Sequence, residues 1–118
     1  FAAGVSVAPV THWKLYDTIY TERYMWTPDG NPDGYRKGAP LNFADRLAAR
    51  LLLAHGTGDD NVHFQNTVRM VDALERAGEQ FSMRIYPNAQ HGIGGPTRQV
   101  NLFRMITDHL TETLGERP

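Results

Sequence analysis

The sequence predicts an α/β fold in which three parallel strands alternate with helices, in the order βαβαβα. Two observations support this expectation. Short runs of apolar residues, typical of strands inside a parallel sheet, recur along the chain. Between these runs lie longer segments in which apolar residues return every three or four positions, as they do on one face of a helix. Right-handed crossovers would place the loops that follow the strands at one end of the sheet.

The first expected strand covers residues 3–8, which are nearly all apolar and are followed by Pro9. A strand that is apolar on both faces is typical of the interior of a parallel sheet. Because the sequence opens directly on this pattern, we expect Phe1 to be a cut edge and the chain to be part of a larger domain.

A helix is expected next, over residues 12–25, with Thr11 as its N-terminal cap. Aromatic residues recur along it at steps of three and four positions, which would place them in one row on the helix. These residues are Trp13, Tyr16, Tyr20 and Tyr24. Residues 28–34 are rich in Pro, Gly, Asn and Asp, and we expect them to form a surface loop.

The remaining elements continue the alternation of strands and helices. Asp60 or Asn61 could cap the helix that follows the second strand, and Gly78 could end it. In order, we expect a short helical piece, a strand, a helix, a strand and a final helix, over about residues 42–47, 50–55, 61–77, 81–86 and 97–114.

Composition and charge argue against several functions. The chain has 118 residues and a formal net charge of −1, with acids and bases interspersed, so it creates no field that would recruit nucleic acid. It contains no cysteine, which excludes disulfides and thiol chemistry. No zinc-binding or nucleotide-binding motif is present, and we expect neither a metal nor another cofactor.

Two expected loops carry the residue types of a catalytic acid and base. Asp59 and Asp60 follow the second expected strand, and His91 follows the third. The acid and the histidine of a Ser–His–Asp triad occupy these places in α/β hydrolases, where the carboxylate orients the imidazole and stabilises its charged form. The alternative is that these are ordinary turn residues. Spacing alone leaves both Asp59 and Asp60 open as the acid.

The sequence lacks a nucleophile to accompany this pair. Its only serines, Ser6 and Ser82, lie inside expected strands, and no Gly-X-Ser-X-Gly motif is present. We therefore interpret residues 1–118 as the C-terminal portion of an α/β-hydrolase fold, with the nucleophile outside this chain. His55 ends a strand beside a glycine, and we expect it to be a hydrogen-bonded structural residue.

Three segments of the sequence point to a family more specifically than the spacing of the candidate acid and histidine does. They are Gly56-Thr57-Gly58-Asp59-Asp60-Asn61-Val62-His63-Phe64, Tyr20-Thr21-Glu22-Arg23-Tyr24-Met25 and His91-Gly92-Ile93. With them, the chain resembles the prolyl oligopeptidase family of serine peptidases, and more narrowly its dipeptidyl-peptidase IV subfamily. The resemblance runs from Phe1 to about the last helix. It implies a partial catalytic domain, which packs against the remainder of that domain and an N-terminal β-propeller in a homodimeric protein.

The resemblance also implies roles for individual residues. Asp59 matches the triad acid, His91 the base, and Asn61 a side chain that holds a backbone carbonyl of the peptide substrate. The pocket for the residue before the scissile bond matches Val10, Trp13, Tyr16, Tyr20 and Val62. Flat aromatic faces would suit a proline ring or an alanine methyl group. Without the resemblance, aromatic residues at helical spacing would be read as core, and Asn61 as a helix cap.

These observations leave three functions to compare. The leading one is a serine peptidase that releases dipeptides ending in proline or alanine. The second is an esterase or acylaminoacyl-peptidase that uses the same Asp59 and His91. The third is a non-catalytic pseudo-peptidase that serves as an interaction module. By itself the chain is expected to be inactive, because it lacks a nucleophile. It is also expected to self-associate, because an unpaired apolar sheet edge invites strand addition.

Overall fold

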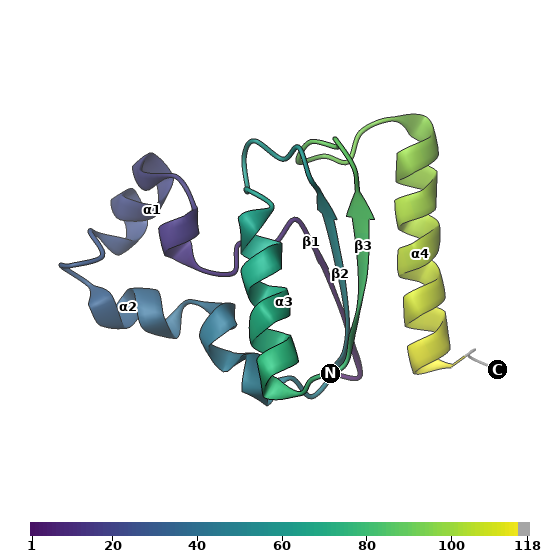
Figure 1. Cartoon of the computed structure of the whole chain (residues 1–118), viewed down its shortest axis with the longest axis horizontal. Helices are drawn as coiled ribbons and strands as arrows, with labels where there is room; N and C mark the ends of the chain where they lie inside the picture. The colour runs from purple at the N-terminus through teal and green to yellow at the C-terminus, as the bar shows by residue number, and fades with distance from the viewer. Residues whose placement is uncertain (116–118) are drawn as a thin grey trace.

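The computed structural model describes residues 1–115 and contains a three-stranded parallel sheet (Figure 1). The strands lie side by side in the order β1 (Ala3–Val7), β2 (Arg50–Gly56) and β3 (Phe81–Tyr86). The register pairs Val7 with Ala54 and Gly56 with Tyr86, so the carboxyl ends of all the strands lie at the same edge of the sheet. The predicted fold class, with parallel strands that alternate with helices, is confirmed.

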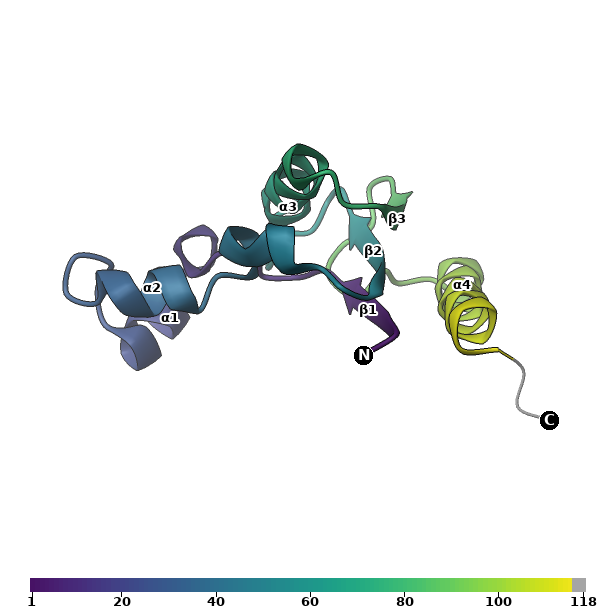
Figure 2. The same cartoon turned by 90° about the horizontal axis from the view of Figure 1, so that it is seen from below.

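Two long helices cover opposite faces of the sheet (Figure 2). On one face, α3 (Gln65–Ala77) places Leu74 against Leu53 of β2. On the other face, α4 (Pro96–Leu114) places Leu102 in a cluster with Ala54 of β2. Because successive side chains of a strand point to opposite faces, the unbroken apolar run of β2 fills both cores.

The aromatic segment differs from the single helix predicted over residues 12–25. A 3₁₀ turn, η1 (Trp13–Leu15), is followed by a separate helix, α1 (Thr18–Met25). The chain is extended at Tyr16 (φ −116°, ψ 166°), and the Asp17 carboxylate then accepts a hydrogen bond of 2.8 Å from a backbone N–H in the first turn of α1. An aspartate that caps a new helix competes with continuation of the preceding turn, which explains the break.

The stretch predicted to be a surface loop contains the start of a helix, α2 (Pro32–Lys37). The Asn31 side chain caps it, and proline suits its first position, so the same turn-forming residues begin a helix here. The buried Tyr35 donates a hydrogen bond of 2.7 Å from its hydroxyl to the carbonyl oxygen of Trp26. A second 3₁₀ segment, η2 (Pro40–Arg46), then leads into β2.

Helix α3 begins at Gln65, four residues later than predicted. The Asp59 carboxylate accepts hydrogen bonds from the backbone N–H groups of Asn61 and Val62, and this holds the intervening residues in a turn instead of a helix. The prediction that Asp60 or Asn61 caps this helix is therefore wrong: the residue before α3 is Phe64, and no side chain caps the helix. The predicted strands agree with the structure to within one residue, and α4 begins one residue earlier than expected.

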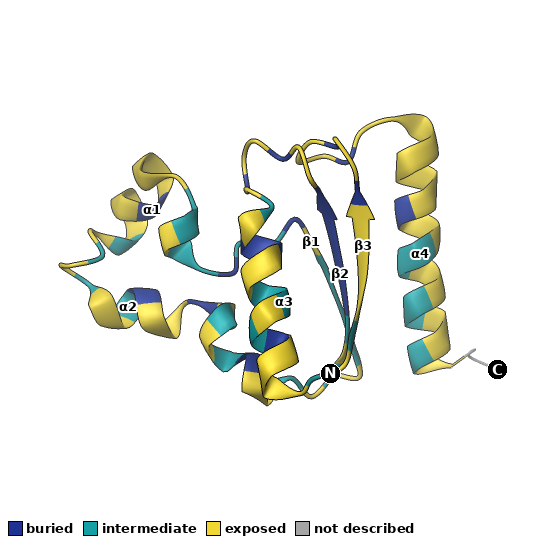
Figure 3. Cartoon of the chain, in the orientation of Figure 1, coloured by how far each residue is buried: buried dark blue, intermediate teal, exposed yellow. Residues whose placement is uncertain are grey.

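Helices α1 and α2 project to one side of the sheet, and most of their residues are exposed (Figures 1 and 3). Thr11 ties this projection to α3: its backbone N–H donates to Oδ1 of Asn66 at 3.0 Å, and its hydroxyl donates to the Asn66 carbonyl oxygen at 2.8 Å. Thr11 therefore binds α3 and does not cap a helix. Over residues 1–115, no helix has the length and apolar character needed to cross a membrane.

Candidate active site

The candidate acid lies in the loop that follows β2. Asp59 is buried, and its Oδ1 accepts hydrogen bonds from the N–H groups of Asn61 at 3.0 Å and Val62 at 2.9 Å. Asp60 is exposed, and within residues 1–115 its side chain forms no hydrogen bond with His91. The structure thereby separates two acids that are equivalent in the sequence.

The candidate base lies in the loop that follows β3. The Nδ1 atom of His91 is 2.9 Å from Oδ2 of Asp59. Because an ionised carboxylate only accepts hydrogen bonds, Nδ1 carries the proton and donates a hydrogen bond to Oδ2. The His91 side chain is 44% exposed, and its Nε2 has no hydrogen-bond partner among residues 1–115. The imidazole is thus oriented through one nitrogen and accessible at the other, as a general base must be.

The environment of Asp59 favours its charged form. Burial by itself would raise the pKa of this carboxyl group, but the hydrogen bond from His91 and the backbone donors of Asn61 and Val62 outweigh burial and hold the pKa below its ordinary value. Asp59 is therefore ionised at neutral pH and can stabilise a positive charge on His91.

Hydrogen bonds from backbone N–H groups dock the two loops against each other. The Gly58 N–H donates to the carbonyl oxygen of Ala89 at 3.0 Å, and the Asn88 N–H donates to Oγ1 of Thr57 at 2.9 Å. At Gly56 any side chain would overlap the Ala89 carbonyl oxygen, so only glycine permits this close approach. These contacts fix the distance between the acid and the histidine.

Ile93 anchors the histidine loop in the core. Its side chain is fully buried and packs in one cluster with Ala54, Tyr86 and Leu102. Its φ of 45° lies in the left-handed region, which a β-branched residue rarely adopts and which costs about 1–3 kcal/mol. Burial of the side chain offsets this strain and holds the loop close to His91.

The aromatic residues gather in one cluster although they do not share one helix. Ring centroids lie 6.1 Å apart for Trp13 and Tyr16, 6.0 Å for Trp13 and Tyr20, and 5.4 Å for Tyr16 and Tyr20. Tyr20 is 47% exposed, and the other two rings are half-buried. The rings of this cluster are therefore partly exposed, unlike the buried core that helical spacing alone would suggest.

Tyr16 connects this aromatic cluster to the acid loop. Its hydroxyl donates to Oδ1 of Asn61 at 2.9 Å, which leaves the Nδ2 group of this exposed asparagine as a donor. Val62, the next residue, is buried beside Asp59. Val10 is half-buried and opens the segment that leads to the cluster.

Sequence reasoning missed two polar residues at the start of α3. Asn66 and Thr67 are both fully buried. Asn66 binds Thr11, and Thr67 binds His55 through its hydroxyl at 2.7 Å. Thr67 lies on the same face of α3 as the buried Leu74, so a polar interruption of an apolar helix face was the signal that could have revealed it.

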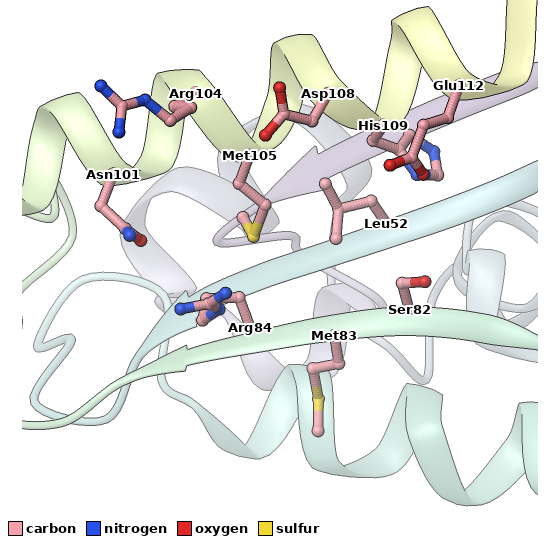
Figure 4. A pocket seen from close by; sticks show the side chains of 10 residues that line it. All are labelled: Leu52, Ser82, Met83, Arg84, Asn101, Arg104, Met105, Asp108, His109 and Glu112. Carbon is pink, nitrogen blue, oxygen red and sulfur yellow. The ribbon is translucent and has the colours of Figure 1, made fainter.

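A separate hollow of about 330 Å³ lies between β3 and α4 (Figure 4). Its lining includes Ser82 and charged residues such as Arg84 and Asp108, but neither Asp59 nor His91. Within residues 1–115, neither serine forms a hydrogen bond with the candidate base, and no group of three or more acidic, histidine or cysteine side chains is arranged to hold a metal ion. We therefore place the candidate active site at the two docked loops.

The parallel sheet and the acid–histidine pair on its carboxyl edge define the C-terminal part of an α/β hydrolase. The chain belongs to the prolyl oligopeptidase family, whose model it matches over residues 1–117. The family expected from the sequence is therefore confirmed.

Individual relatives narrow this similarity. The chain is 46% identical to the probable dipeptidyl-aminopeptidase B of Talaromyces marneffei, over 97% of its own length and 12% of that protein. It is 46% identical to the dipeptidyl aminopeptidase B of Saccharomyces cerevisiae, over 92% of its length and 13% of that protein. The crystal structure of Porphyromonas gingivalis dipeptidyl peptidase 4 matches 96% of the chain at 41% identity and a TM-score of 0.94, and the match covers 16% of that structure. The chain thus spans a small part of the relatives that it matches.

Proposed function

We propose that this chain supplies the acid and the general base of a serine peptidase, with the nucleophile provided by protein outside residues 1–118. The observation that supports this most directly is the contact of 2.9 Å between Nδ1 of His91 and the buried Oδ2 of Asp59, with Nε2 left accessible. Membership of the prolyl oligopeptidase family supports the same assignment.

The proposed roles follow from the two ends of the imidazole. Nε2 of His91 takes the proton of a serine hydroxyl as that oxygen attacks the peptide carbonyl, and it later returns the proton to the leaving amine. Asp59 holds the Nδ1–H tautomer throughout and stabilises the imidazolium that forms between these steps. The carboxylate itself keeps its charge.

The proposed specificity is the release of dipeptides that end in proline or alanine. The names of the relatives support dipeptide release, and the accessible aromatic cluster supports an apolar residue before the cleaved bond. In this proposal the Nδ2 group of Asn61 donates to a substrate carbonyl, which the bond from Tyr16 to Oδ1 supports because it leaves Nδ2 as a donor. In this proposal the pocket is walled by Val10, Trp13, Tyr16, Tyr20 and Val62.

Kinetics of variants in the full-length protein test the proposed triad. His91→Ala and Asp59→Asn are each expected to reduce kcat by roughly 10³- to 10⁶-fold on Gly-Pro nitroanilide. Asp60→Asn is the matched control, because it removes a neighbouring carboxylate that faces solvent. Should Asp60→Asn prove the disabled variant and Asp59→Asn remain active, the assignment of the acid is wrong.

Comparison of substrates separates the peptidase from the other two functions. A peptidase of this kind cleaves Gly-Pro nitroanilide faster than simple esters, and N-terminal acylation of the substrate abolishes its cleavage. Faster cleavage of esters or of acylated peptides would favour the esterase or the acylaminoacyl-peptidase. A full-length protein that neither turns over nor reacts with a fluorophosphonate would be a pseudo-peptidase.

A further inference from the structure

The candidate site contains a second histidine, His55, which has no role in the function proposed above. His55 lies near the end of β2 and is fully buried. Its Nε2 is 3.1 Å from Oδ2 of Asp59 and 2.8 Å from the carbonyl oxygen of Val62, and its Nδ1 is 2.7 Å from Oγ1 of Thr67. One imidazole therefore contacts the acid, the loop that carries the acid, and α3.

The partners of His55 define where its proton lies. An ionised carboxylate and a backbone carbonyl only accept hydrogen bonds, so Nε2 must carry hydrogen to bind Asp59 and Val62. Nδ1 faces the hydroxyl of Thr67, which can donate. The neutral tautomer with the proton on Nε2 satisfies both ring nitrogens without placing a further charge in the interior.

This tautomer completes the set of hydrogen-bond donors around Asp59. Oδ1 binds the two backbone N–H groups, and Oδ2 lies between the two imidazoles, at 2.9 Å from His91 and 3.1 Å from His55. A carboxylate accepts about four hydrogen bonds, so each of its positions is filled. His91 approaches Oδ2 from the accessible side and His55 from the buried side.

We propose that His55 is a positioning residue for the candidate triad: it holds Oδ2 of Asp59 in the place from which this oxygen binds His91. The inference rests on the proposed roles of Asp59 and His91. It differs from a purely structural role for His55, in which the imidazole would only connect β2 to α3 through Thr67. The positioning role depends on Nε2, which contacts Asp59, and the structural role depends on Nδ1, which contacts Thr67. Substitutions that keep one contact and remove the other can therefore separate the two roles.

Two amide substitutions divide these contacts in the full-length protein. The side-chain amide of His55→Gln reaches about as far as Nε2 and can still donate toward Asp59, whereas that of His55→Asn is shorter and reaches only toward Thr67. We expect kcat on Gly-Pro nitroanilide to stay within about tenfold of wild type for His55→Gln, and to fall about 10²-fold for His55→Asn, with KM little changed in both. Equal losses of kcat in both variants would overturn the proposal.

Thr67→Val is the control for the structural role, because it removes the Thr67 hydroxyl and keeps the shape of the side chain. We expect it to lower the melting temperature while kcat stays near that of wild type. A loss of kcat in Thr67→Val as large as that in His55→Asn would show that connection to α3 accounts for the effect, and would overturn the positioning role.

Proton NMR provides a readout that does not depend on turnover. The Nδ1 proton of His91, hydrogen-bonded to Asp59, should give a downfield signal in the wild type and in His55→Gln, and should broaden or disappear in His55→Asn. An unchanged signal in His55→Asn would overturn the positioning role even if His91 were the base. Loss of this signal together with full activity of His91→Ala would instead overturn the proposed function and leave the positioning of Asp59 supported.

Discussion

The two docked loops and the aromatic segment, residues 13–26, differ in how they are attached to the rest of the chain and in how far they are buried. Hydrogen bonds donated by backbone N–H groups join the loops, and Asp59 at their centre is buried. The aromatic segment lies to one side of the sheet, and its rings are half-buried or exposed (Figure 3). Side-chain hydrogen bonds attach it to the rest of the chain, among them that from Tyr16 to Asn61.

This difference matches the tasks that we propose for the two regions. Proton transfer between oriented groups loses about two orders of magnitude in rate when a group moves by roughly 1 Å. An apolar pocket depends mainly on the faces that it presents to a substrate. Changes in the loops are therefore expected to reduce turnover on every substrate, and changes in the aromatic segment to alter the preference among substrates.

Among changes that leave the candidate acid and base in place, the largest effect is expected from Gly56→Ala, which should break the docking of the loops. The added methyl group would overlap the carbonyl oxygen of Ala89, which can move only together with the histidine loop. We expect kcat to fall about 10²-fold or more on proline and non-proline nitroanilides alike. Gly58→Ala is the matched control, because its methyl group would meet the Asn88 backbone at 3.4 Å, an ordinary contact. Equal losses in both variants would contradict this account of the docking.

The next effect concerns the aromatic cluster. Tyr16→Ala should reduce kcat/KM on Gly-Pro nitroanilide by roughly 10- to 100-fold, and less on Gly-Leu nitroanilide, because a ring that contacts proline is lost. Tyr16→Phe keeps the ring and loses only the hydrogen bond to Asn61, so its loss should be several-fold smaller. A uniform loss on both substrates, accompanied by a large fall in melting temperature, would indicate that the ring serves only in packing.

Asn66→Ala should loosen the attachment of the aromatic segment more than it disturbs the loops. It removes the bond from Nδ2 of Asn66 to the His63 carbonyl oxygen at the end of the acid loop, but the backbone N–H of residue 66 still donates to the same oxygen. The substitution leaves the buried N–H of Thr11 without its acceptor, which costs about 1–3 kcal/mol in the free energy of unfolding. We expect KM for proline substrates to rise more than kcat falls. Urea denaturation and steady-state kinetics measure the two effects, with Gln65→Ala, an exposed position on the same helix turn, as the control. A fall in kcat with constant KM would argue against separate regions.

The smallest effect is confined to acidic pH. The pKa of Asp59 is lower in the folded protein than in the unfolded chain, where it is about 3.9, so its contribution to stability is complete above that value. This contribution is lost as the pH falls through the folded pKa. Urea unfolding between pH 2 and pH 7 should therefore show a weaker dependence on pH for Asp59→Asn than for wild type. Asp60→Asn should retain the dependence, and an equal change in both variants would contradict the prediction.

The approach of Asp59 to His91 was predictable because it depends on topology. Alternation of strands and helices implies parallel strands, and their carboxyl ends bring the two loops to one edge of the sheet. The choice between Asp59 and Asp60 was not predictable by the same argument. It depends on which carboxylate turns inward to accept the N–H groups of Asn61 and Val62, and periodicity carries no information about that.

The errors in the aromatic segment have a local cause. Periodicity predicted one helix because the rings recur at helical steps, but Asp17 begins a new helix within that stretch. The rings still form a cluster, because Thr11 and Asn66 bring the segment against α3 through contacts 55 residues apart in sequence. A pattern read within a short window cannot contain a contact of that range.

All the described partners of the candidate acid and base lie within one continuous stretch, residues 55–91. This stretch runs from the end of β2 through α3 and β3 to the histidine loop, and the register of the two strands sets its geometry. Recombination between relatives could therefore exchange the acid–base pair as a single cassette, with its spacing intact. The aromatic rings lie outside that stretch, whereas Asn61 and Val62 lie within it. The part of substrate preference that depends on the rings could therefore be inherited from a different parent than the acid–base pair.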